Sequence, residues 1–176
     1  MVVSNYGNER RRGNSLTVIN AKSNKVERTI DLGDNLMPHG LTAVPHTNNV
    51  IVAAEGTNAL LLVNVITGII EKRVLTNQKQ SHMSALNPNN KVAYISNIGS
   101  NSVSVIDLEK GELLQNIVCG KGAVGVDVTP DGKEIWVSNS IENTITVLDA
   151  VSYKTLATLK CNEEPNRLKI TPDGKY

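Results

Sequence analysis

Residues 92–134 read VAYISNIGSNSVSVIDLEKGELLQNIVCGKGAVGVDVTPDGKE, and this stretch decides the fold because it is repeated along the chain. The next stretch, IWVSNSIENTITVLDAVSYKTLATLKCNEEPNRLKITPDGKY at 135–176, aligns with it along its length. Earlier copies occupy residues 50–91 and, with a longer loop, residues 1–49. The last three copies start 42 and then 43 residues apart, and a period in the low forties is the length of one four-stranded propeller blade.

Each copy divides into four short β-type runs that are separated by turn residues. The run at 102–107 alternates apolar residues with serines, which is the period of two expected for a strand. The copy ends in the turn TPDGK, where proline fixes φ and Asp-Gly accepts a tight turn. Every run is short and every connection is polar, so long helices have no room and the chain is predicted to be all-β. The strands expected in this copy are 92–96, 102–107, 113–118 and 125–129.

Short antiparallel sheets that recur along a chain can protect their edges by packing radially. The sequence therefore predicts a single domain over 1–176, a β-propeller of four-stranded antiparallel blades. Both faces of a blade touch neighbouring blades, and for this reason we expect Trp136 to pack between two of them.

Composition excludes several classes of protein. The chain has 18 Lys+Arg and 17 Asp+Glu, so it lacks the charge excess that binding to nucleic acid by bulk charge requires. No apolar run approaches the roughly 20 residues of a membrane span, and the opening MVVSNYGNERRR contains no signal peptide. Cys119 and Cys161 fall at the ends of successive outermost strands, too far apart for a disulfide, and no CxxCH motif offers covalent haem attachment.

The repeat motifs resemble those of the YVTN β-propeller repeat family over essentially the whole chain. One bacterial, largely uncharacterised branch of that family is similar in four further stretches: MPHGL, IVAAEGTNALLLVN, QSHMSALNP and YISNIGSNSVSVIDL. The family motifs are VSN at 3–5, ISN at 95–97, VSN at 137–139, SVSVID at 102–107, TITVLD at 144–149 and TPDGK at 129–133 and 171–175.

The resemblance implies a larger ring and a location outside the cytoplasm. Full-length relatives carry seven blades, usually behind a signal peptide, so four copies make about half of a ring in the periplasm or at the cell surface. Related propellers include surface-layer proteins, the haem-bearing domain of a nitrite reductase, and lactonases. We therefore expect a truncated frame that forms an open, partial ring.

Two other arrangements stay open at this point. The last expected strand, 167–171, would complete the first blade and close a four-bladed ring, or two copies would form an eight-bladed ring. An open ring exposes apolar blade faces, so missing blades or self-association are the expected partners.

His39 and His82 are the sharpest candidates for a functional site. Each lies six residues before a turn proline, Pro45 or Pro88, so the two occupy one repeat position just before an innermost strand. Equivalent side chains of adjacent blades should converge at the mouth of the central channel. There two imidazoles would share a transition metal or orient an anionic ligand, with Glu55 as a further ligand or a general base. The alternative is that each imidazole binds loop backbone.

Other polar residues recur at the same end of the blades. Asn97 and Asn139 follow second strands, where their amides are expected to hold loop backbone, with ligand contact as the alternative. Arg167 begins the last expected strand, directly after the last crossing between blades, and is a further ligand-binding candidate. Asp127 and Lys169 share a position along innermost strands, which predicts an ion pair between adjacent blades.

These observations favour a scaffold that binds a small ligand, a cell-envelope component or a protein partner, without nucleic acid. The alternative is a propeller enzyme, either a lactonase-like hydrolase or a metal- or haem-associated oxidoreductase, that uses His39, His82 and Glu55. No nucleophile elbow, phosphate loop or zinc-protease motif is present in the sequence.

Overall fold

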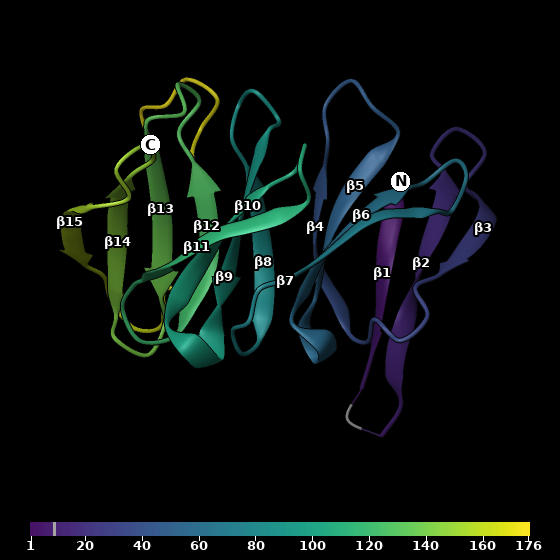
Figure 1. Cartoon of the computed structure of the whole chain (residues 1–176), viewed down its shortest axis with the longest axis horizontal. Coiled ribbons are helices and arrows are strands. Elements are labelled where there is room, and N and C mark those ends of the chain that lie inside the picture. Colours follow the sequence, from purple (N-terminus) through teal and green to yellow (C-terminus); the bar gives the residue numbers. More distant parts are fainter. Residues whose placement is uncertain (9) are drawn as a thin grey trace.

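Four antiparallel sheets stand side by side like the blades of a fan (Figure 1). The computed structural model describes residues 1–8 and 10–176. The first sheet has three strands, and each of the other three sheets has four. In the first sheet the strands are β1 (Val2–Gly7), β2 (Arg12–Asn20) and β3 (Lys25–Asp31).

Each of the four-stranded sheets is a meander in which every strand pairs with the next strand along the chain. They begin at Pro38, Ser81 and Ala123, and so reproduce the period of the sequence. The second sheet contains β4 (Pro38–Ala43), β5 (Asn49–Ala54), β6 (Ala59–Asn64) and β7 (Ile70–Leu75). The third contains β8 (Ser81–Leu86), β9 (Val92–Asn97), β10 (Ser102–Asp107) and β11 (Glu112–Val118), and the fourth contains β12 (Ala123–Val128), β13 (Glu134–Asn139), β14 (Thr144–Asp149) and β15 (Thr155–Lys160).

The predicted all-β fold is confirmed, and the four strands expected between residues 92 and 129 agree with β9 to β12 within two residues at either end. Each sequence copy runs from the second strand of one sheet to the innermost strand of the next, so the sheets are offset from the copies by one strand. The described helical residues form two single 3₁₀ turns, Glu55–Thr57 and Ile98–Ser100. Neither turn is long and apolar enough to cross a membrane.

The hydrophobic core lies between the sheets in three separate layers. In one layer Leu16 of β2 packs with Leu61 of β6, and both are fully buried. Burying one such side chain contributes about 1.5–3 kcal/mol, so contact between blades is the main stabilising interaction. The middle layer includes Ile51, Leu60, Ile95 and Ile106, and the third includes Tyr94, Val103, Ile135, Val137 and Leu148.

Serine side chains add a polar link between blades at one end of the ring. Ser96 on β9 donates to the carbonyl oxygen of Val124 at 2.6 Å. Ser138 makes the same bond to Asn166 at 2.7 Å, and Ser4 donates to His39 at 3.3 Å. The accepting residues share one repeat position, so each serine fixes the innermost strand, or the equivalent segment, of the following blade.

Two expectations about the last blade are wrong. Residues 167–171 do not form a strand, because an innermost strand needs the second strand of its own sheet and none lies beside this segment. The first and last sheets stand at opposite ends of the fan, so the ring is open and the four-bladed closure does not occur (Figure 1). Trp136 is half-buried on the face of β13 turned away from the third sheet, not between two blades of the chain.

Candidate functional site at the channel mouth

His39 and His82 are the second residues of the innermost strands β4 and β8, and a β-bulge surrounds each of them. Pairing of β8 with β9 jumps from Ser81↔Asn97 to Ser84↔Ile95, so three steps on one strand match two on the other. The pairing of β4 with β5 shifts in the same way around His39. A bulge re-aims the side chain that it contains, which directs both imidazoles to the same end of the ring.

Gly40 lets the two innermost strands approach closely beside the histidines. A Cβ atom built at Gly40 would lie 2.6 Å from the carbonyl oxygen of His82 and 2.8 Å from the Cα of Met83. Any side chain at this position would therefore separate β4 from β8. Glycine next to His39 is thus a local requirement for the contact between the two rings.

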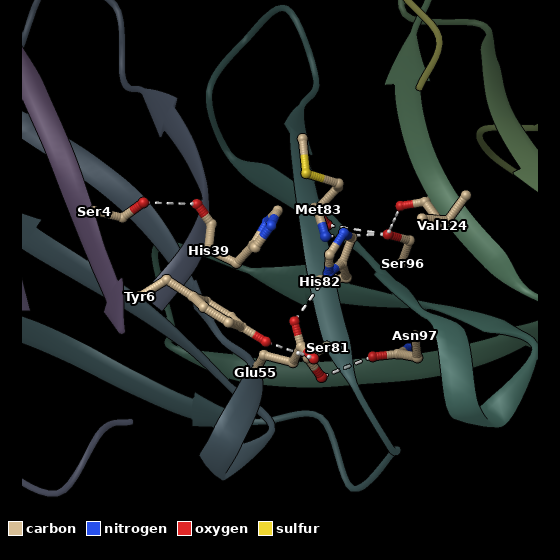
Figure 2. Close-up of polar contacts among 10 residues, drawn as sticks. All are labelled: Ser4, Tyr6, His39, Glu55, Ser81, His82, Met83, Ser96, Asn97 and Val124. Carbon is tan, nitrogen blue, oxygen red and sulfur yellow. Dashed lines mark hydrogen bonds and ion pairs between the residues drawn. The ribbon is translucent and has the colours of Figure 1, made fainter. Parts of the chain in front are cut away.

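The two imidazole rings stack face to face, as Figure 2 shows, with centroids 3.9 Å apart and planes at 27°. Tyr6 of β1 packs edge-on against His39, with a centroid distance of 5.4 Å and an interplanar angle of 88°. Three neighbouring sheets thus contribute one ring each. The predicted convergence of His39 and His82 is present in the structure.

Glu55 joins this cluster from the 3₁₀ turn that follows β5. Its carboxylate lies 3.0 Å from Nδ1 of His82, and it accepts a hydrogen bond of 3.3 Å from the Tyr6 hydroxyl (Figure 2). The turn is held because the backbone N–H of Glu55 donates to Met37. The hydrogen bond with His82 lowers the pKa of Glu55, outweighing the burial that raises it. The carboxylate is therefore ionised at neutral pH.

His39 has the least satisfied side chain of the cluster. Its Nδ1 atom is buried and has no hydrogen-bond partner within the part of the chain that the structure describes. Burial is the main cause that lowers the pKa of His39, and His82 lowers it further; the Glu55 carboxylate acts in the opposite direction, and Arg167 has the smallest lowering effect. The ring is thus kept neutral. Burial and the Glu55 carboxylate raise the pKa of Tyr6.

The stacked rings are not oriented to chelate a metal ion together. A histidine binds a metal through a lone pair in the plane of its ring, with bonds of about 2 Å. Because the two ring planes are nearly parallel, the lone pairs of the two imidazoles do not point towards one common metal position. Among the described residues, no group of three or more His, Cys, Asp or Glu side chains is placed to hold a metal ion.

Asn97 and Asn139 are fully buried inside their blades and do not line the channel mouth. The Asn97 amide donates to Ser102 at 3.2 Å and to Ser104 at 2.9 Å, and Asn139 donates likewise to Thr144 and Thr146. Their amides therefore join the second strand to the third strand. The prediction that these amides bind loop backbone is wrong, because both amides donate hydrogen bonds to side-chain hydroxyl groups of the third strand.

Arg167 is exposed beside the cluster, on the segment that follows β15, and its charge acts on His39. Two residues further on, Lys169 pairs with Asp127 at 2.9 Å, as predicted. Asp127 also accepts the backbone N–H of Ile170 at 2.8 Å, and its side chain is 9% exposed. The pair fixes this segment against β12.

The two cysteines have free thiols, and burial raises the pKa of Cys119 to about 12, which makes it a poor nucleophile. Sequence reasoning missed Tyr6, which binds both His39 and Glu55. The sequence feature that could have identified Tyr6 is its position directly after the VSN motif, because aromatic residues make up only 3% of the chain.

Comparison with known proteins agrees with this architecture. The structure resembles a chain of hydrazine synthase from Kuenenia stuttgartiensis, with a TM-score of 0.74 and 26% sequence identity. The match covers 78% of this chain and 40% of the hydrazine synthase chain, so this chain spans well under two thirds of that protein's length. None of the curated proteins matches. A family model described as YncE-like β-propeller matches residues 48–171, and the chain therefore belongs to the YncE-like β-propeller family.

Proposed function

We propose that this chain is a binding scaffold that holds a small anionic ligand at the channel mouth, in the cluster of Tyr6, His39, Glu55, His82 and Arg167. The blades supply a rigid frame, and the site uses side chains from the first three of them together with Arg167 from the segment after β15. Following the family resemblance, the proposed setting is the periplasm or the cell surface, where the ligand belongs to an envelope component or a protein partner.

The unpartnered Nδ1 of His39 is the observation that carries this proposal. By contrast, Glu55 binds both His82 and Tyr6, so these three side chains have partners within the cluster. A buried polar atom without a partner costs about 1–3 kcal/mol, so a ligand that hydrogen-bonds this nitrogen is favoured. The guanidinium of Arg167 nearby favours an anion over a neutral ligand.

Acetate and inorganic phosphate are suitable probes, followed through the ring nitrogens of the histidines in long-range ¹H–¹⁵N spectra. We expect saturable shifts at His39 and His82 and none at His46, which is exposed in the turn after Val44. Arg167→Met should weaken binding, whereas Lys22→Met, an exposed cation in another turn, should not. Equal shifts at all three histidines would overturn the proposal.

A second candidate function is hydrolysis, favoured by the hydrogen bond between Glu55 and His82. A carboxylate that holds Nδ1 of an imidazole is the arrangement used by general bases, which remove a proton from attacking water. Turnover of γ-butyrolactone that is lost in Glu55→Gln and retained in Lys22→Met would support it. A chain that binds the anionic probes but hydrolyses no lactone would exclude it.

A further inference from the structure

His39 and His82 stack so closely that a charge on one ring is felt directly by the other. Their centroids lie 3.9 Å apart, a distance at which two protonated imidazoles repel each other. The stacked rings are therefore built to hold one added proton and not two. We infer that the anion site proposed above, on which this step rests, binds each anion together with one proton held by the stacked rings.

Glu55 already places one negative charge in the cluster. Its carboxylate lies 3.0 Å from Nδ1 of His82, and its side chain is only 11% exposed (Figure 2). An anion that enters beside His39 therefore meets a largely buried carboxylate of the same sign. Two negative charges are tolerated in such a site when a positive charge lies with them. A proton on the stacked rings supplies this positive charge next to both.

The hydrogen-bond chemistry of His39 leads to the same requirement. Its buried Nδ1 atom has no partner among the described residues. A carboxylate ligand only accepts hydrogen bonds, so it needs an N–H group on the ring nitrogen that it meets. A neutral imidazole carries one N–H group, whereas the protonated ring carries one on each nitrogen. Protonation thus makes Nδ1 a donor whichever tautomer the neutral ring has.

The other charged and titratable groups around the rings do not supply this proton or replace it. They are Tyr6 of β1, Arg12 of β2, Glu55 of the first 3₁₀ turn and Arg167 of the segment after β15. Burial raises the pKa of Tyr6, and the hydrogen bond with the imidazole lowers that of Glu55, so each keeps one form near pH 7. The two guanidinium groups stay charged. Arg167 is exposed, and solvent screens its charge from the interior of the cluster.

The direction of the coupling follows from the surroundings of His39. Burial lowers its pKa below the ordinary 6.5, so the ring is neutral at pH 7 while no anion is bound. An anion beside the ring has the opposite effect, because a negative charge favours the protonated form. The anion thus draws a proton from the buffer, and by reciprocity a lower pH strengthens binding of the anion.

Acetate is the probe, because it stays fully ionised between pH 7 and pH 8. Its binding is followed through the ring nitrogens of the histidines in long-range ¹H–¹⁵N spectra. For the natural sequence the dissociation constant should rise roughly three- to tenfold from pH 7 to pH 8, since one proton accompanies each anion. At saturation near pH 7, the nitrogens of His39 should move to the shifts of a protonated imidazole.

The variant His39→Asn separates the anion from the proton. An asparagine amide donates a hydrogen bond from near the position of Nδ1 without carrying a charge, so any remaining acetate binding should change less than about twofold over this pH range. His46→Asn is the matched control. His46 is exposed in a turn with φ of 61°, a conformation that asparagine accepts, and its replacement should leave the full pH dependence. Circular dichroism establishes that each variant is folded.

Calorimetry of the natural sequence counts the protons without any substitution. The enthalpy of acetate binding at pH 7 is measured in Tris and in Bis-Tris, two cationic buffers with different heats of ionisation. Its dependence on the buffer should correspond to an uptake of about 0.7 to 1 proton for each acetate bound. Acetate binding with no proton uptake and a constant affinity would overturn this inference and leave the anion site standing. Failure of acetate to shift His39 at any of these pH values would overturn the anion site and the inference with it.

Discussion

The imidazoles of His39 and His82 lie face to face with centroids 3.9 Å apart, yet among the described residues only His82 has a carboxylate on its Nδ1 atom. The two histidines are equivalent in the repeat but not in their surroundings. Glu55 satisfies one ring and leaves the other neutral and unpartnered. This asymmetry divides the site into a hydrogen-bonded pair, Glu55 with His82, and the neighbouring His39 ring, whose buried Nδ1 has no partner among the described residues.

Neutral His39 should make the stability of the protein depend on pH. Burial lowers its pKa below the ordinary 6.5, so the unfolded chain binds a proton at a higher pH than the folded chain does. The free energy of unfolding should therefore rise with pH through the range just below 6.5 and level off above it. In His39→Gln this slope should disappear, as measured by urea denaturation in a series of buffers. The same slope in both proteins would contradict the assignment.

Replacing Glu55 should destabilise the protein at neutral pH. Its pKa lies below the ordinary 4.5, chiefly because of the hydrogen bond with His82, so the stabilisation is present above pH 4.5 and is lost as the pH falls through the folded pKa. Glu55→Gln should cost about 1.5–3 kcal/mol at pH 7, the contribution of a hydrogen bond to a charged group. The difference from the natural protein should shrink below pH 4.5. Exposed Glu163→Gln is the control, with no expected change.

The blade architecture could be predicted from the sequence because its signals are local. The strands of the copy at 92–134 are bounded by turn residues, and the period gives the order of the sheets. The strand expected at 167–171 was wrong for a physical reason. A β-strand is defined by its partner, and a repeat can assign a register to a segment without supplying the neighbouring strand.

The candidate site was predictable in position but not in geometry. The repeat register brings His39 and His82 to one end of neighbouring blades, as the structure has them. Whether two rings stack or converge on a metal depends on side-chain torsion angles and on the bulges in β4 and β8, which no periodicity encodes. The contact with Tyr6 depends on the first blade, where the longer loop interrupts the alignment.

Asp127 should contribute more to stability than the other polar groups at its repeat position. It accepts bonds from both Lys169 and the backbone of Ile170, and it is almost fully buried. Asp127→Asn should cost about 1.5–3 kcal/mol, since it weakens charge-assisted bonds. Thr42→Ala removes a neutral bond to Ser84 and should cost about 1 kcal/mol. Lys169→Met should cost less than about 1 kcal/mol, because the lysine is mostly exposed. Equal effects of the first two changes would reject the structural ion pair.

Beside the buried asparagine, the third blade has a hydroxyl group that the fourth blade lacks, and supplying it should stabilise the protein. In the third blade Ser81 donates to Oδ1 of the Asn97 side chain at 2.8 Å. The fourth blade has Ala123 opposite Asn139, and Oδ1 of the Asn139 side chain is buried without a partner among the described residues. Ala123→Ser should therefore raise the free energy of unfolding by about 1 kcal/mol.

The reverse change provides the matched comparison. Ser81→Ala leaves Oδ1 of the Asn97 side chain buried without the Ser81 donor, which should lower the free energy of unfolding by about 1–3 kcal/mol. Both variants change one oxygen atom at the same repeat position, and chemical denaturation measures them on one scale. Because the two sites lie in adjacent blades with separate amide networks, their effects should add in the double variant. Destabilisation by both substitutions would show that the fourth blade has no room for the hydroxyl.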